Sequence, residues 1–254
     1  MILKRPLRTI ILAAGEGKRM NSPLPKVLHP MLNRPLIRWV WDTALQSGSE
    51  RIVIVVGHGR PLVMQEMSST DAVFAVQWQQ RGTGDAVQSA KRAVHHRYSG
   101  DILILSGDVP LLTSKTISLL KYTHERSNAV ATVLTFRAPQ PGSYGRIIRD
   151  RNRKIKKIVE AKDATLEELS VDEVNSGIYV FQAKWLWPEL ARLKPENAQG
   201  EYYLTDVVKS AVDQGLLVET VETSDPIEVE GVNTIEQLHR LEAIALERMH
   251  KRDA

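Results

Sequence analysis

The sequence contains no cysteine among its 254 residues. This absence excludes disulfide frameworks, thiolate metal sites and cysteine nucleophiles, and it fits a reducing, cytoplasmic setting. Long apolar runs are missing too, because the stretch from Thr9 to Ala14 behind the basic N-terminus is too short for the core of a secretory signal and far too short to span a bilayer. We therefore expect a cytoplasmic protein without membrane contact.

The charged residues form no long blocks of a single sign. Lys and Arg number 34 against 30 Asp and Glu, which gives a formal net charge of +4 and a pI near 9.2, but the two signs are interleaved. The stretch from Arg146 to Lys157 is the most basic, and it has the pattern of a solvated hairpin. The balance indicates a weak preference for anionic ligands, and we expect no nucleic-acid partner.

Short β-rich apolar runs alternate with segments that have helical spacing of apolar residues. The runs are Thr9–Ala14, Ile52–Val56, Ala72–Val76, Ile102–Leu105 and Ala129–Thr135. The alternation predicts an α/β fold with a Rossmann-like, mostly parallel sheet flanked by helices on both faces. Ligands bind such sheets at the carboxyl ends of the strands, so we expect the chemistry just after Ala14, Val76 and Leu105.

The pattern changes after Pro139. A strand, a basic turn and a second strand over Ser143–Val159 predict a hairpin laid over the main sheet. The elements expected next are a buried strand at Val174–Phe181, helices at Trp185–Arg192 and Thr205–Gln214, and a late strand at Leu216–Val221. The final segment, from Thr234 to about Lys251, predicts a helix whose apolar face packs on the body or on something beyond this chain.

A glycine loop, GEGKRM at 15–20, follows the first predicted strand directly. Glycine lets backbone amides approach a phosphate closely, although two glycines after a strand also suit a plain turn. The loop is not a P-loop, which requires glycine at Leu12 and Ser or Thr at Arg19, and a dinucleotide fingerprint requires glycine at Met20. Its cations, together with Lys26 between fixed prolines in SPLPKVLHP, favour a triphosphate.

These residues resemble the sugar-nucleotide pyrophosphorylases, and within that family the uridyltransferase domain of bacterial N-acetylglucosamine-1-phosphate uridyltransferases. The blocks that carry the resemblance, in the family's order, are LAAGEGKRM, KVLHP, VQWQQRGTGDAV, GDVPLL, YGRI, VEAKDA, EVNSGIYVF, NAQGEYYLTDVV and EVEGVN. They cover nearly the whole chain, and NAQGEYYLTD is specific to this branch. The resemblance implies a nucleotide-diphospho-sugar transferase fold, with a nucleotidyltransferase domain at 1–232 and a C-terminal helix at 233–254 that packs on it or leads to an absent domain.

The resemblance also implies where the nucleotide binds. The implied nucleotide-binding residues are Leu12, Ala13, Ala14, Gly15, Gln77, Gln80, Gly82 and Thr83. Arg19 and Lys26 are implied to hold the phosphates as catalytic residues. The side-chain amides of Gln77 and Gln80 offer a donor and an acceptor to a uracil edge, although taken alone they also suit exposed polar residues before a helix.

A Mg²⁺ cofactor is implied at Asp108 and Asn233. Asp108 ends the apolar strand ILIL with a carboxylate, and by itself it reads equally well as the N-cap of a helix. Two oxygen ligands, completed by triphosphate oxygens and water, suit the way in which Mg²⁺ is usually held. Asn233 also stands where it would cap the final helix.

Sugar recognition is implied in the second half of the chain. The residues concerned are Tyr144, Gly145, Glu160, Asn175, Glu201, Tyr203 and Thr205. The resemblance places them along one crevice, in contact with the sugar hydroxyls and the N-acetyl group. Taken singly, Tyr144 and Tyr203 also suit packing aromatics, and Glu160 suits a surface charge.

The implied activity is transfer of UMP from UTP to N-acetylglucosamine 1-phosphate, giving UDP-N-acetylglucosamine, a cell-wall precursor, and pyrophosphate. The nearest alternative is the same chemistry with dTTP, CTP or another sugar 1-phosphate such as glucose 1-phosphate. A different alternative is a non-catalytic nucleotide-sugar-binding protein, against which the retained Arg19, Lys26, Asp108 and Asn233 argue.

Four positions depart from the family pattern. Lys18 stands for threonine, Ser106 for tyrosine, Asp85 for the histidine of GTGHA and Ala161 for the histidine of EHKDA. These changes leave the phosphate chemistry intact but leave the base and the sugar open.

Length is the larger departure from the family. The bacterial enzymes continue into an acetyltransferase β-helix, whereas this sequence stops at Ala254, either as a natural stand-alone enzyme or as a truncated first domain. We expect no acetyltransferase activity, and the apolar face of the last helix leaves room for a homo-oligomer.

Overall fold

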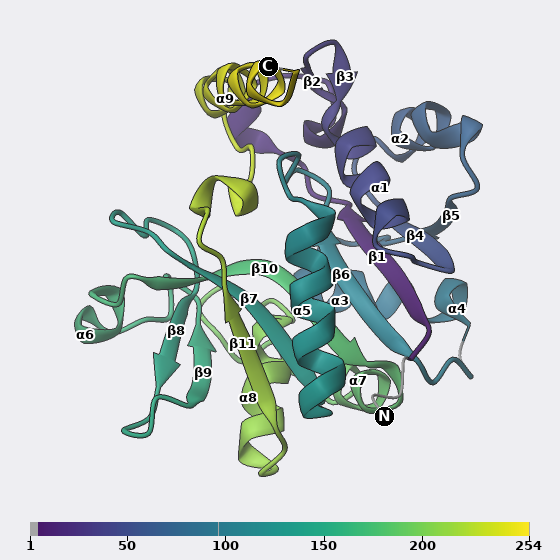
Figure 1. Cartoon of the computed structure of the whole chain (residues 1–254). Helices are drawn as coiled ribbons and strands as arrows, with labels where there is room; N and C mark the ends of the chain where they lie inside the picture. The colour runs from purple at the N-terminus through teal and green to yellow at the C-terminus, as the bar shows by residue number, and fades with distance from the viewer. Residues whose placement is uncertain (1–4, 96, 254) are drawn as a thin grey trace.

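A nine-stranded sheet lies between two layers of helices in the computed structural model, which describes residues 5–95 and 97–253 (Figure 1). Its main path has the order β11-β7-β10-β6-β1-β4-β5, and the hairpin strands β8 and β9 branch from β10. The strands are β1 (Leu7–Ala13), β4 (Arg51–Val56), β5 (Val73–Val76), β6 (Asp101–Ser106), β7 (Ala131–Arg137), β8 (Arg146–Arg149), β9 (Ile155–Val159), β10 (Glu173–Gln182) and β11 (Val218–Glu222), with a separate pair β2 (Pro30–Met31) and β3 (Arg34–Pro35). This architecture confirms the predicted α/β fold.

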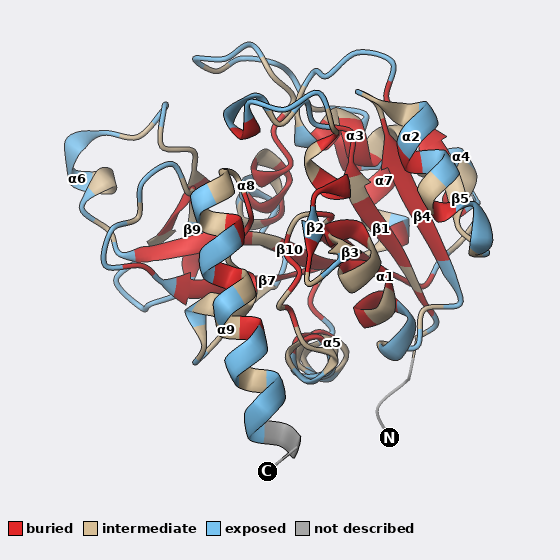
Figure 2. Ribbon diagram, turned by 90° about the horizontal axis from the view of Figure 1, so that it is seen from above, coloured by how far each residue is buried: buried red, intermediate tan, exposed pale blue. Residues whose placement is uncertain are grey.

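Helices cover both faces of the sheet. They are α1 (Leu36–Gln46), α2 (Arg60–Glu66), α3 (Thr83–Ser89), α4 (Lys91–Val94), α5 (Ser114–Ser127), α6 (Leu166–Leu169), α7 (Ala183–Leu190), α8 (Thr205–Asp213) and α9 (Ile235–Asp253). Adjacent strand residues point to opposite faces. Ile11 therefore belongs to a core cluster with Trp41 of α1 and Leu120 of α5, whereas Ile10 belongs to another with Val87 of α3 and with residues of α7 and α8. The central strands are buried on both sides, as Figure 2 shows in red.

One strand of the main path departs from the parallel direction. β10 runs antiparallel to both β6 and β7, with Glu173 opposite Arg137 and Phe181 opposite Ala131. β7 ends at the carboxyl edge of the sheet, and the chain returns through the hairpin β8–β9 to that same edge without a crossover helix. A strand that starts at this edge must run backwards, because a parallel return needs a crossover connection.

The hairpin β8–β9 extends from the sheet and does not lie over it, so that part of our prediction is wrong. Arg146 of β8 pairs with Val174 of β10, and the hairpin stands beside the main strands in Figure 1. Ile147 and Ile158 join the same core cluster as Val207 of α8. The hairpin swings outward because its apolar side packs on α8, which lies on one face of the sheet.

The C-terminal helix α9 packs on the body through the predicted apolar face. Leu238, Leu241 and Ala245 are buried against Met31 and Leu36 of the chain's first third, and Met249 stays exposed. Thr234 caps the helix, because its side chain accepts a hydrogen bond from the Gln237 amide at 3.2 Å. The prediction that Asn233 caps α9 is therefore wrong. A domain division at residue 233 stays a prediction, and its outer ends, 1–4 and 254, lie outside the described residues.

None of the helices within 5–95 and 97–253 combines the length and the apolar character needed to cross a bilayer.

A buried charge fixes the amino-terminal edge of the sheet. Asp101 is fully buried, accepts a hydrogen bond from Arg5 at 2.7 Å and lies 3.4 Å from the His124 ring. Breaking a buried pair leaves a charge without a partner, which costs about 3 kcal/mol. We expect Asp101→Asn to lower the free energy of unfolding in urea by about this amount.

Asp42 provides the matched control for Asp101. It pairs with Arg34 at 2.6 Å, but both side chains are about two-fifths exposed. Exposed pairs contribute about 1 kcal/mol or less, so Asp42→Asn should leave the urea midpoint nearly unchanged. Equal losses in the two variants would contradict the structural role of Asp101.

Candidate active site

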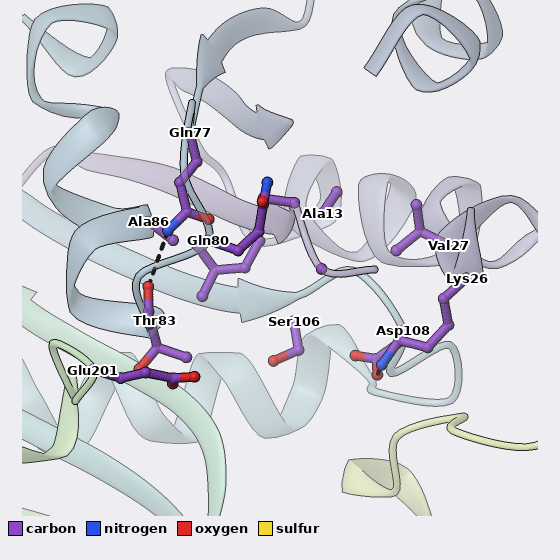
Figure 3. Close-up of a pocket in the computed structure, with 14 residues that line it drawn as sticks. Ala13, Lys26, Val27, Gln77, Gln80, Thr83, Ala86, Ser106, Asp108 and Glu201 are labelled. Carbon is purple, nitrogen blue, oxygen red and sulfur yellow. Dashed lines mark hydrogen bonds and ion pairs between the residues drawn. The ribbon is translucent and has the colours of Figure 1, made fainter. Parts of the chain in front are cut away.

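The carboxyl ends of β1 and β6 lie side by side and open a cleft between them. Leu12 pairs with Ser106 in register, and the Gly107 amide donates to the Leu12 carbonyl at 2.9 Å. A cavity of about 320 Å³ sits above this junction (Figure 3). Its lining comprises Leu12, Ala13, Ala14, Gly15, Lys26, Val27, Gln77, Gln80, Gly82, Thr83, Ala86, Ser106, Asp108 and Glu201.

All eight residues predicted to bind the nucleotide line this one cleft. Lys26 and Asp108, predicted for phosphate and metal, line it as well. Sequence reasoning missed Val27 and Ala86, although each directly follows or lies within a motif already singled out, and it noted Ser106 only as a departure from the family. In Figure 3 Ser106 lies between Thr83 and Glu201 on one side and Lys26 and Asp108 on the other.

A second cavity, of about 420 Å³, adjoins the first and is more polar. The two share Gly15, Lys26, Gln80 and Glu201. The remaining lining residues of the second are Glu16, Gly17, Lys18, Arg19 and Asn233. The glycine loop therefore separates a base-sized cleft from a region lined by cations, which is the layout that a nucleoside triphosphate requires.

The two predicted cations and the two predicted metal ligands meet at this boundary. The Lys26 ammonium pairs with the Asp108 carboxylate and donates to the Asn233 side-chain oxygen at 3.2 Å. Arg19 donates to the same Asn233 oxygen at 2.9 Å. A backbone hydrogen bond from Val232 to the Asp108 carbonyl, 2.9 Å long, ties the two loops together.

Asp108 and Asn233 present the oxygen donors that a magnesium ion prefers. Their oxygens approach one point, which the Lys26 ammonium marks as favourable for a cation. The loop that carries Asp108 does not cap a helix, because α5 starts at Ser114 and Thr113 is its N-cap. The helix-cap alternative for Asp108 is thus wrong. No group of three or more His, Asp or Glu residues suited to a metal occurs in the described part of the chain.

The predicted sugar residues form a second group on the hairpin side. Of the seven, Glu201 is the one that lines the two cavities above. Glu160 accepts a hydrogen bond from the Thr205 hydroxyl at 3.0 Å, and a Cβ placed on Gly145 would lie 3.5 Å from a Glu160 oxygen. Gly145, Glu160 and Thr205 are thus neighbours, although they come from three separate segments.

Side-chain partners already engage the other members of this group. Asn175 is 8% exposed, and its amide donates to the Tyr179 hydroxyl at 2.6 Å. Tyr144 packs edge-on against Phe136 with ring centroids 5.1 Å apart. The Tyr203 hydroxyl accepts a hydrogen bond from Gln199 at 2.7 Å. The packing alternative therefore describes Tyr144 and Tyr203 at least in part.

Burial perturbs the acid–base groups of this region. It raises the pKa of Glu160 above its ordinary value, the Thr205 hydrogen bond opposes that rise, and the nearby charges of Asp163 and Asp206 add to it. Burial also raises the pKa of Tyr203 to about 12 and that of Tyr144 above its usual range. Both phenols are neutral hydrogen-bonding groups at neutral pH, and Glu160 is a partly buried acid, not the surface charge that the sequence also allowed.

A family profile for nucleotidyl transferases matches residues 8–225. The chain belongs to the nucleotidyl transferase family. It is 44% identical over 246 residues to the bifunctional protein GlmU of Geobacter metallireducens, covering 96% of this chain and 52% of that protein. It is 46% identical over 238 residues to the bifunctional protein GlmU of Paraburkholderia phymatum, covering 94% and 52%. The chain thus spans about half the length of the curated relatives it matches.

The fold of this nucleotidyl transferase also occurs in a solved structure, a UDP-glucose pyrophosphorylase complexed with UDP-glucose. The two superpose with a TM-score of 0.76 over 96% of this chain and 99% of the other, at 16% sequence identity. At this identity the likeness concerns the fold.

Gly17 holds the glycine loop against Lys26. Its φ is +64°, and a Cβ there would lie 2.6 Å from the Lys26 Cβ. We expect Gly17→Ala to push Lys26 aside and to lower kcat by about a hundredfold, as misplacements of about 1 Å do. The steady-state rate of nucleotidyl transfer measures this loss.

Gly48 supplies the control for backbone strain. Its φ is +75°, but a Cβ there meets nothing within 4 Å. Gly48→Ala should therefore cost about 1 kcal/mol of stability through backbone strain. Gly17→Ala should share this cost in addition to its clash with Lys26, but only Gly48→Ala should keep the wild-type turnover. Similar turnover in the two variants would show that the contact between Gly17 and Lys26 is unimportant.

Proposed function

We propose that this chain transfers UMP from UTP to N-acetylglucosamine 1-phosphate, giving UDP-N-acetylglucosamine and pyrophosphate. The observation that carries the proposal is the convergence of Lys26, Arg19, Asp108 and Asn233 beside a cleft that is lined by Gln77 and Gln80. The name of the relatives, bifunctional protein GlmU, supports it, as do the sequence blocks shared with N-acetylglucosamine-1-phosphate uridyltransferases.

The nucleotide and the sugar 1-phosphate bind on opposite sides of this cluster of charged and polar residues. The uridine lies in the cleft against Leu12, Gln77 and Thr83, and its phosphates extend past the glycine loop toward Arg19. The sugar lies toward the hairpin, where Glu160 accepts a hydrogen bond from a sugar hydroxyl. Thr205 already fixes one Glu160 oxygen, so the carboxylate is oriented before the sugar arrives.

A phosphate oxygen of the sugar 1-phosphate attacks the α-phosphorus of UTP in line. The bond between the α-phosphorus and the bridging oxygen of pyrophosphate breaks, and pyrophosphate leaves with that electron pair. The nucleophile already carries negative charge, so no general base is required. Catalysis rests on alignment and on offsetting negative charge, and we assign Lys26 to the reacting phosphates and Arg19 to the departing pyrophosphate.

Asp108 and Asn233 are the residues that would hold Mg²⁺, with the remaining ligands taken from phosphate oxygens and water. Mg²⁺ would supply positive charge to the phosphates. The Lys26 ammonium, which in the structure contacts the side-chain oxygens of both residues, would then be available to the phosphates.

Pyrophosphate release tests this function directly. UTP, dTTP and CTP are each combined with N-acetylglucosamine 1-phosphate and with glucose 1-phosphate, in Mg²⁺ and in excess chelator. We expect the highest kcat/KM for UTP with N-acetylglucosamine 1-phosphate, and no turnover in chelator. A higher value for another pair would reassign the substrates, and tight binding without turnover would indicate a nucleotide-sugar sensor.

A further inference from the structure

The side-chain amide of Gln77 is held in one orientation. Its nitrogen donates to the Gly82 carbonyl at 3.1 Å and to the Asp85 carboxylate at 2.9 Å, which uses both of its hydrogens. A carbonyl and a carboxylate can only accept, so the nitrogen must face them and the oxygen must face away. In Figure 3 the Gln77 oxygen lies on the side of Gln80, toward the cleft.

Asp85 is itself fixed on its other side. Its second carboxylate oxygen accepts from Arg81 at 2.7 Å, one turn earlier, and its side chain is 16% exposed. The Gln77 residue is 5% exposed, so neither side chain has much freedom to turn. Hydrogen bonds therefore link Arg81 to Asp85 and Asp85 to Gln77. They leave the side-chain oxygen of Gln77 as the atom of this series that faces the cleft.

We propose that Asp85 is a positioning residue that makes the cleft select a uracil-type base over cytosine. The inference rests on the proposed function, which places the nucleotide base against Gln77. Uracil carries an N–H donor at ring position 3, which an acceptor oxygen pairs with. Cytosine has an acceptor at that position, so its lone pair would face the Gln77 oxygen without a hydrogen between them.

A site built to pair with one polar group rejects an analogue that lacks it, because the partner is left buried and unpaired. Rejection depends on the amide being unable to rotate. If Gln77 turned over, its nitrogen would present a donor and would accept cytosine. Asp85 removes this freedom, since a turned amide would bring its oxygen against the carboxylate.

Base selectivity is measured as the ratio of kcat/KM for UTP to that for CTP, with one sugar phosphate throughout. In Asp85→Ala we expect the ratio to fall about 10- to 100-fold, the effect of one hydrogen bond to a charged group. Asp85→Asn, which can turn an N–H toward Gln77, should lower the ratio as well, and Asp85→Glu, which keeps a carboxylate, should restore most of it. The KM for the sugar phosphate should not change.

Asp213→Ala is the matched control. Asp213 pairs with Lys209 four residues earlier on α8, as Asp85 pairs with Arg81, but it lies away from the cleft. This control should keep the wild-type ratio. A structural role for Asp85 would lower turnover with UTP and CTP equally, so an unchanged ratio in folded Asp85→Ala or Asp85→Asn overturns the proposal.

Calorimetric binding of UTP and CTP, without sugar phosphate, separates this proposal from the proposed function. If the wild type prefers UTP in binding and Asp85→Ala loses that preference, Asp85 positions Gln77 even where no pyrophosphate is released. If the wild type turns over UTP but binds CTP equally well, the positioning role is wrong and the function stands.

Discussion

Asp108→Asn is expected to lower kcat for pyrophosphate release by about a hundredfold while the fold stays intact. The substitution keeps the shape of the side chain but removes the charge that pairs with Lys26 and that would hold Mg²⁺ in the proposed mechanism. Removing one preorganised charge-stabilising group at a reacting phosphate costs about 3 kcal/mol. The circular dichroism spectrum of the variant should match that of the wild type. The side chains of Lys26 and Asp108 are 19% and 14% exposed, so water can solvate the Lys26 ammonium when its partner charge is gone.

The dependence on Mg²⁺ gives this variant a second readout. If Asp108 holds the ion, Asp108→Asn should need a higher Mg²⁺ concentration for half-maximal rate than the wild type. Asp42→Asn, which removes an aspartate from an exposed pair and lines neither cavity of the site, should behave as the wild type. Turnover within threefold of the wild type in a folded Asp108→Asn variant would remove Asp108 from the mechanism.

A double-mutant cycle tests whether Lys26 and Asp108 act as a unit. We expect Lys26→Met to lose about as much activity as Asp108→Asn, because Lys26 and the ion that Asp108 would hold both offset negative charge on the same reacting phosphates. Residues that share one interaction are strongly non-additive. The double variant should therefore be far more active than the product of the two single losses predicts. Full additivity would show that Lys26 and Asp108 act independently in turnover.

Glu160→Gln is expected to weaken sugar-phosphate use and to stabilise the protein at alkaline pH. Replacing a charged acceptor costs about 1.5–3 kcal/mol, so kcat/KM for the sugar phosphate should fall about 10- to 100-fold. The KM for UTP should stay near its wild-type value. The glutamine side chain can still accept the hydrogen bond that Thr205 donates, so the local structure should persist.

The stability effect follows from the direction of the pKa shift. Burial raises the pKa of Glu160 in the folded protein, so the folded state holds the proton more tightly than the unfolded chain does. The contribution of this carboxyl to stability is complete below its ordinary pKa and is lost as the pH rises through the raised pKa. A glutamine side chain does not ionise, so the variant should exceed the wild type in Tm at pH 8, and the difference should shrink toward pH 4.

Two outcomes would contradict the assignment of Glu160. A Tm difference that is the same at pH 4 and pH 8 would mean that another change, not the carboxyl, causes it. An unchanged KM for the sugar phosphate would remove Glu160 from the sugar site. Glu196, an exposed carboxylate with a side chain 76% accessible, is the control, and Glu196→Gln should alter neither quantity.

Several features of the site were readable from short sequence patterns. The strand before Gly15 and the strand before Asp108 are apolar runs that end in loop residues, and neighbouring parallel strands must end at one edge. The prolines around Lys26 indicated that the loop holds this lysine in a fixed position. These inferences need only local periodicity and the rule that the ends of neighbouring parallel strands share an edge. The structure confirms that the two strands lie side by side and end at one edge.

Other features depended on contacts between distant segments. Asn233 lies 207 residues from Lys26, yet the two share a hydrogen bond. Even the orientation of Gln77, whose partners Gly82 and Asp85 follow only five and eight residues later, depends on the turn that leads the chain into α3. Sequence spacing and composition do not predict such contacts, because the conformation of a loop depends on the helices and strands that pack beneath it.

By itself, the sequence determined the order of strands and helices and the position of the glycine loop at the cleft, because alternating apolar patterns and glycine-rich strand ends act over a few residues. The tertiary structure decided the reversed direction of β10, the outward course of the hairpin and the burial of Glu160 among other acids. These properties depend on which segments, far apart in the sequence, pack against one another, and this packing exists only in the folded molecule.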